Sequence, residues 1–271
     1  MARLRIGTSG YLYQHWRPLL YPRGLGAGKW LGRFASVFDT CELNATFYRL
    51  PTAKAVAGWA ERTPKGFLFA AKGSRYLTHM KRLLERGEGV RKYFALVEGL
   101  GEKLGPVLWQ LPPRFRADAA RLDAFLSALP KGIRNAVEFR DPSWYSREIC
   151  DVLDAHGAAF CEHDLVPARP PRLTGDFRYL RFHGATGKYS GRYGRAALGA
   201  VARDLQATRR RGHDAFVYFN NDLGGHAVHD ALDLLDLTGD EAPAEAFEQL
   251  ARADAERRHP IPAGSTQSGR D

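Results

Sequence analysis

The stretch Asn135-Ala-Val-Glu-Phe-Arg140 carries the pattern that decides the fold of this chain. It is a short, largely apolar run that ends in charge just before Pro142. Side chains alternate along a strand, so Glu138 and Arg140 share one face. Segments with apolar residues at helical spacing flank the run on both sides. A strand between two amphipathic helices is typical of α/β proteins.

The same unit recurs along the whole chain of 271 residues. Strand-like runs bounded by Gly, Pro or Asn alternate with helical stripes, which predicts a parallel sheet covered by helices. Eight runs favour closure into a (β/α)8 barrel of the TIM type. An open dinucleotide-binding sheet would need G-x-G-x-x-G after its first strand, and Gly7-Thr-Ser-Gly10 lacks the third glycine. The runs are residues 4–9, 40–47, 66–72, 106–111, 135–140, 158–164, 177–183 and 215–221.

One unit departs from this alternation after the sixth run. Pro167, Pro170 and Pro171 occupy the place of the next helix, so we expect a loop there. We expect residues 1–258 to form one barrel domain and residues 259–271 to form a flexible tail.

Composition narrows the class of protein. No apolar run approaches the roughly 20 residues that cross a bilayer, and a strand pattern begins at Leu4, so we expect a cytoplasmic protein without a membrane partner. Cys41, Cys150 and Cys161 lack a metal or disulfide spacing and are expected to be reduced core residues. The net charge of +10 favours anionic partners, although an arginine-rich composition alone would give the same charge.

Polar residues close the predicted strands. Barrel chemistry lies at the C-terminal ends of strands, so these residues predict a wet, ligand-binding rim. The alternative is an internal ion network in which Glu42, Glu138, Arg140 and Arg181 pair with one another. The strand-closing residues are Glu42 with Asn44, Lys72, Gln110, Glu138 with Arg140, Glu162 with Asp164, Arg181 with His183, and Asn220 with Asp222.

Several ordered motifs resemble one known family across almost the whole chain. They are Ile6-Gly-Thr-Ser-Gly10, Glu42-Leu-Asn-Ala-Thr-Phe-Tyr-Arg-Leu-Pro51, Gly105-Pro-Val-Leu-Trp-Gln-Leu-Pro-Pro113, Val137-Glu-Phe-Arg-Asp-Pro-Ser-Trp144 and Tyr218-Phe-Asn-Asn-Asp222. The chain is similar to the YecE-like family, domain of unknown function family 72. The resemblance implies a TIM barrel and no settled activity. The matching positions are Glu42, Asn44, Tyr48, Gln110, Glu138, Arg140, Trp144, Asn220, Asn221 and Asp222.

The first functional hypothesis is a role in binding or hydrolysing nucleic acid or another phosphate-bearing ligand. Glu138 is then the acid or base, Glu42 and Asp222 are its polar partners, and His183 is a proton shuttle. The proposed anion contacts are Lys72, Arg140 and Arg181, with Ser9 as a further phosphate contact. The loop after the seventh run mixes glycines, cations and tyrosines, which suits phosphate contact and base stacking. Its candidate residues are Lys188, Tyr189 and Tyr193.

Two other hypotheses stay open. A metal-free hydrolase of a carbohydrate or similar small substrate would use Glu42 and Glu138 as paired carboxylates, with aromatic platforms such as Tyr48 and Trp144. A non-catalytic barrel would bind its ligand at the rim without turnover. The residue pattern decides neither the need for a cofactor or metal ion nor the oligomeric state.

Overall fold

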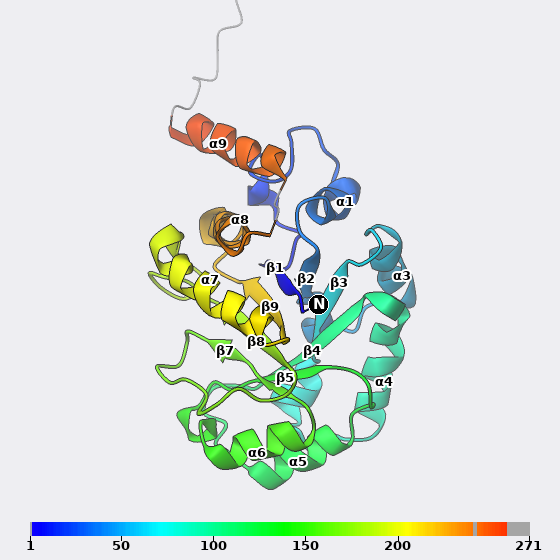
Figure 1. The fold of residues 1–271 in the computed structure, drawn as a ribbon. Helices are drawn as coiled ribbons and strands as arrows, with labels where there is room; N and C mark the ends of the chain where they lie inside the picture. The colour runs from blue at the N-terminus through cyan, green and yellow to red at the C-terminus, as the bar shows by residue number, and fades with distance from the viewer. Residues whose placement is uncertain (1, 241–242, 259–271) are drawn as a thin grey trace, which may run out of the picture.

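The computed structural model describes residues 2–240 and 243–258, so the predicted tail at 259–271 lies outside the described residues. The strands pair in parallel in the order β6-β5-β4-β3-β2-β1-β9-β8-β7. They curl into a nearly closed barrel with helices outside it, which confirms the predicted TIM-type fold (Figure 1). The strands are β1 (Leu4–Ser9), β2 (Thr40–Leu43), β3 (Leu68–Lys72), β4 (Leu104–Gln110), β5 (Asn135–Glu138), β6 (Ala159–Phe160), β7 (Glu162–His163), β8 (Phe177–Phe182) and β9 (Asp214–Phe219).

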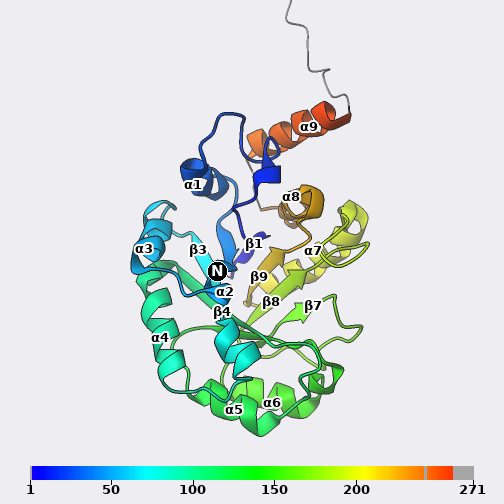
Figure 2. The same cartoon turned by 180° about the vertical axis from the view of Figure 1, so that it is seen from behind.

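The helices surround the barrel when it is seen from either side (Figures 1 and 2). They are α1 (Trp30–Ala35), α2 (Ala45–Tyr48), α3 (Ala53–Glu61), α4 (Glu88–Val97), α5 (Ala119–Ser127), α6 (Arg147–Ala155), α7 (Gly194–Arg210), α8 (His226–Thr238) and α9 (Ala244–Arg258). The described residues also form short helical turns, which are η1 (Gln14–Trp16), η2 (Ala27–Lys29), η3 (Tyr76–Met80), η4 (Glu98–Lys103), η5 (Pro142–Trp144) and η6 (Leu223–Gly225). The sequence pattern did not predict α9, which lies beyond α8 at the edge of the molecule.

The sixth predicted strand is broken in two, and the break lets one segment close the barrel. Its first half, β6, pairs with β5, and the amide of Cys161 donates to the Val137 carbonyl over 2.9 Å. Its second half, β7, pairs with β8 instead. Residues 164–176 contain no helix, as the prolines predict.

The second strand is shorter than the sequence suggests. The pattern predicts a strand to residue 47, but β2 ends at Leu43 and a single helical turn, α2, follows. The Thr46 hydroxyl donates to the carbonyls of Leu43, over 3.0 Å, and of Lys72, over 2.7 Å. These bonds hold the turn against the end of β3.

The interior of the barrel contains side chains of very different sizes. One part is built from small side chains, among them Ala70, Ala136 and Ala159, and another from the rings of Tyr179 and Tyr218. The polar positions of the candidate site follow this apolar filling toward the C-terminal ends of the strands. Within the described residues, no helix combines the length and apolarity needed to span a membrane. The three cysteines, Cys41, Cys150 and Cys161, are free and buried, as predicted.

Candidate functional site

The last inward-facing position at the C-terminal end of each strand is polar when β6 and β7 are counted as one broken strand. Lys72 follows the interior residue Ala70 by two positions, and Arg181 follows Tyr179 in the same way. Strand alternation therefore carries both side chains onto the inner face. The eight positions meet at one mouth of the barrel. They are Ser9, Glu42, Lys72, Gln110, Glu138, His163, Arg181 and Asn220.

Arg181 forms the centre of a buried ion network at this mouth. Its Nη2 donates to Glu42 Oε1 over 2.7 Å and its Nη1 to Glu138 Oε2 over 2.5 Å. All three side chains are fully buried. Arg140 Nε donates to the other oxygen of Glu138. The four residues pair with one another, which is the ion-network alternative of the sequence analysis.

Both carboxylates of the network are held in the ionised form. Burial alone would raise the pKa of Glu42, but the charges of Arg181 and Lys72 outweigh it and lower that pKa. Hydrogen bonds from Ser9 and, over 2.6 Å, from Tyr179 contribute to the lowering. The pKa of Glu138 lies well below its usual value, because Arg140 and Arg181 together outweigh the effect of burial.

This arrangement speaks against a glycosidase built on Glu42 and Glu138. The two carboxylates are close enough to share one guanidinium, but Arg181 occupies the space between them. Glycoside hydrolysis also needs one carboxylic acid with a raised pKa, whereas both pKa values here are lowered. The same facts weaken the predicted role of Glu138 as acid or base.

His183 is held neutral between acidic and basic neighbours. Its Nδ1 lies 3.1 Å from Asp164 Oδ1, and its Nε2 lies 3.1 Å from Arg140 Nη2 and 3.2 Å from Arg181 Nη1. Guanidinium groups only donate hydrogen bonds, so Nε2 of His183 is an acceptor. Nδ1 therefore carries the ring hydrogen and donates a hydrogen bond to Asp164. Burial lowers the pKa of His183 to about 4. A proton-shuttle role near neutral pH therefore has no support in this geometry.

Lys72 differs from the other buried ions because no carboxylate contacts it. Its Nζ lies 4.4 Å from the centre of the Phe47 ring and makes no hydrogen bond or ion pair with a described residue. Burial lowers its pKa to about 8. The charges of Glu42 and Glu138 raise the pKa of Lys72, whereas the charges of the two network arginines lower it. The Lys72 side chain is thus largely buried, and its ammonium has no ion partner among the described residues.

His163 belongs to this mouth, although the strand-end pattern predicts its neighbours Glu162 and Asp164 there. The break at Cys161 leaves β7 unpaired with β5, and His163 bridges the gap by hydrogen bonding the Phe139 carbonyl over 2.7 Å. Counting by twos from the interior residue Cys161 would have found it. Glu162 turns outward instead.

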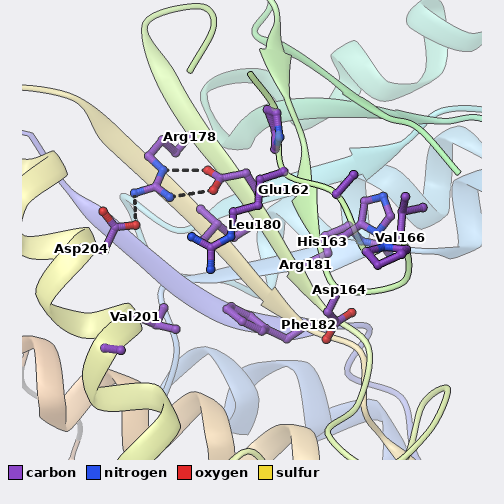
Figure 3. A pocket seen from close by; sticks show the side chains of 15 residues that line it. Glu162, His163, Asp164, Val166, Arg178, Leu180, Arg181, Phe182, Val201 and Asp204 are labelled. Carbon is purple, nitrogen blue, oxygen red and sulfur yellow. Dashed lines mark hydrogen bonds and ion pairs between the residues drawn. The ribbon is translucent and has the colours of Figure 1, made fainter. Parts of the chain in front are cut away.

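The outer face of β8 borders a cavity of about 570 Å³ between the proline-rich loop and α7, and His163, Asp164 and Arg181 also line it (Figure 3). In it, Arg178 bonds both oxygens of Glu162 and, over 2.7 Å, Asp204. The Thr208 hydroxyl accepts a further hydrogen bond from Arg178. The Arg178 guanidinium therefore has its partners within the protein.

Three predicted site residues have contacts that take them away from the ion network. Trp144 is completely buried, stacks on Phe139 at 4.7 Å between ring centres and donates to the Phe115 carbonyl, so it packs the helix layer instead of contacting a ligand. Asn221 is also buried, where its amide donates over 2.7 Å to the carboxylate of Asp230.

Asp222 is the third of these residues. It accepts a hydrogen bond from the Trp16 indole over 2.5 Å and lies 2.9 Å from His15 Nε2. Burial raises the pKa of Asp222 to about 6. Its partners are thus on the first loop of the barrel and do not include Glu138, the partner predicted for it.

The remaining predicted residues line the mouth or its rim. Asn44 donates to Ser9 Oγ over 2.8 Å, while Gln110 and Asn220 are half-buried. On the rim, Tyr48, Lys188 and Tyr189 are exposed, and the Tyr193 hydroxyl donates to Asp164. Among the described residues, no three His, Cys, Asp or Glu side chains are clustered to hold a metal ion.

Solved structures share this architecture. A DUF72 family protein from Thermotoga maritima MSB8 matches with a TM-score of 0.78 and 28% identity, over 88% of this chain and 99% of that one. A DUF72 family protein from Enterococcus faecalis V583 matches with a TM-score of 0.74 and 20% identity, over 87% and 95% of the two chains. The second likeness shows the fold alone.

Sequence comparison gives the same family. The UPF0759 protein YunF of Bacillus subtilis (strain 168) is 27% identical in an alignment of 266 positions that covers 85% of this chain and 94% of the relative. The family model described as protein of unknown function DUF72 matches residues 5–254. This chain therefore belongs to the DUF72 family.

Proposed function

We propose that the barrel mouth binds a phosphate-bearing ligand and that the Lys72 ammonium contacts its anionic group. The observation that carries the proposal is the Lys72 ammonium, which ends a largely buried side chain and has no ion partner among the described residues. A buried charge is costly unless it is paired, so an anion that reaches Lys72 gains an interaction that the protein itself does not satisfy. Binding is the part that this geometry supports, and no hydrolytic step is assigned.

Arg140 is the second contact that we propose. Its Nε and Nη2 are bound to Glu138 and His183, which leaves Nη1 without a hydrogen bond to a described residue. Its charge lowers the pKa of Lys72, and both residues lie at the same mouth, so we propose that one anion contacts both cations. The sequence also predicts Arg181 as an anion contact. We assign it no such contact, because two buried carboxylates already share its charge.

The test is a calorimetric titration with inorganic phosphate at constant ionic strength and pH 7. We expect Lys72→Met to weaken phosphate binding by about tenfold or more, the size of one lost charged hydrogen bond. The matched control is Lys131→Met, which removes the same charge from an exposed site just before β5, at the opposite end of the barrel. Equal binding by all three proteins, or no binding by any of them, would overturn the proposal.

A further inference from the structure

A groove with exposed aromatic side chains lies on the rim next to Lys72. Its cavity measures about 350 Å³ and is built from the loop after β2 and the loop after β3. The Tyr48 side chain is 77% exposed and that of Tyr76 is 40% exposed, which is unusual for rings with packing partners nearby. We call this surface the aromatic groove; its residues include Phe47, Tyr48, Leu50, Ser74, Tyr76 and Met80.

The aromatic groove also carries positive charge. Arg49 and Arg75 line it, and neither guanidinium forms an ion pair or hydrogen bond within the described part of the chain. The acidic residues of the groove are already engaged. Glu85 accepts the amide hydrogens of Gly87, over 2.8 Å, and Gly89, and Glu88 pairs with Lys92 at 2.6 Å. The two arginines therefore remain available to an anion.

Phe47 joins this groove to the proposed phosphate site. Lys72 Nζ lies over the Phe47 ring, 4.4 Å from its centre. The Tyr48 ring contacts the same ring at 4.9 Å between centres, in an edge-on arrangement. Tyr48 and the Lys72 ammonium therefore contact the same ring, which places the aromatic groove beside the proposed phosphate site.

We propose that the aromatic groove stacks the base of a nucleotide whose phosphate lies at Lys72. This inference rests on the proposed function and names the ligand class. Exposed rings beside unpaired arginines match the way proteins hold unpaired bases, because a base stacks on any aromatic face while cations follow the phosphates. The excess of positive charge over the whole chain, +10, favours the same class of ligand.

The experiment compares nucleoside 5′-monophosphates with ribose 5-phosphate, which keeps the phosphate and the sugar but lacks the base. We expect the monophosphates to bind about tenfold more tightly, the size of one base stacked on an aromatic ring. The Tyr48→Ala, Tyr76→Ala double variant should lose that difference. The matched Tyr48→Phe, Tyr76→Phe variant keeps both rings and should retain it.

Failure of this inference is distinguishable from failure of the proposed function. If the base adds no affinity while Lys72→Met still weakens phosphate binding, the phosphate site stands and base stacking is excluded. If the alanine variant retains the preference for the base, the groove is excluded as its site. Short single-stranded oligonucleotides and their abasic analogues are titrated in parallel. Tighter binding of the intact oligonucleotides supports base stacking, and equal affinity for the intact and the abasic oligonucleotides contradicts the inference.

Discussion

The β3 side and the β8 side of the barrel mouth each bury a cation, but only the β8 side buries its partners too. Arg181 is bound by two carboxylates that are as buried as it is. Lys72, at the matching position of β3, has the Phe47 ring and no carboxylate. The difference teaches that one ring of strand ends combines a network whose charges are paired within the protein with a cation that has no ion partner among the described residues. A ligand should add most at the second.

The largest expected effect comes from removing each cation in turn. Arg181→Met leaves the buried Glu42 carboxylate without an ion pair and Glu138 with Arg140 alone, and should lower the free energy of unfolding by about 3–5 kcal/mol. Lys72→Met removes an unpaired charge and should leave stability unchanged or raise it. Urea denaturation of the two variants measures both effects.

Arg178→Met is the control for burial in this comparison. Its partners Glu162 and Asp204 are partly exposed, so water can solvate them when the arginine is lost, and the loss of stability should be smaller than for Arg181→Met. A Lys72→Met variant that is as destabilised as Arg181→Met would break the comparison, because Lys72 would then have a structural partner.

Acidification should lower the free energy of unfolding through His183, on the β8 side of the mouth. The folded pKa of His183 is about 4, below the unfolded value of about 6.5, so the unfolded chain binds more protons between these pH values. Stability should therefore be fully present above about pH 6.5 and fall as the pH drops toward 4, by up to about 3 kcal/mol from this group.

Denaturant unfolding at several pH values, with His183→Gln as the variant that cannot titrate, isolates this effect. The variant should lose a large part of the pH dependence in that window. His213→Gln, at an exposed position outside the network, is the matched control for loss of a histidine. An unchanged pH dependence in His183→Gln would show that the imidazole is not held neutral.

The fold was predictable from sequence to the extent that local patterns determine it. Alternation along each run located the strands, and Pro167, Pro170 and Pro171 located the missing helix. The predicted strand 40–47 ran too long because the bonds of the Thr46 hydroxyl to the carbonyls of Leu43 and Lys72 are contacts that no periodicity encodes. The helix α9 has a weak apolar stripe, which gave no comparable signal.

The site was predictable in composition but not in pairing. Strand ends correctly placed Glu42, Glu138 and Arg181 on one inner face. Their pairing joins residues 139 and 43 positions apart, and only closure of the barrel brings them together. The same limit applies to Trp144, whose position at a strand end looked like the rim although its ring packs against Phe139.

The most direct measurement is the pKa of Lys72 itself, followed by NMR on protein with labelled lysine side chains and assigned by the signal missing in Lys72→Met. We expect a pKa of about 8 in the free protein. Saturating inorganic phosphate should raise it, because a bound anion stabilises the charged ammonium. An ordinary lysine pKa that phosphate leaves unchanged would contradict the claim that Lys72 is a buried charge awaiting an anion.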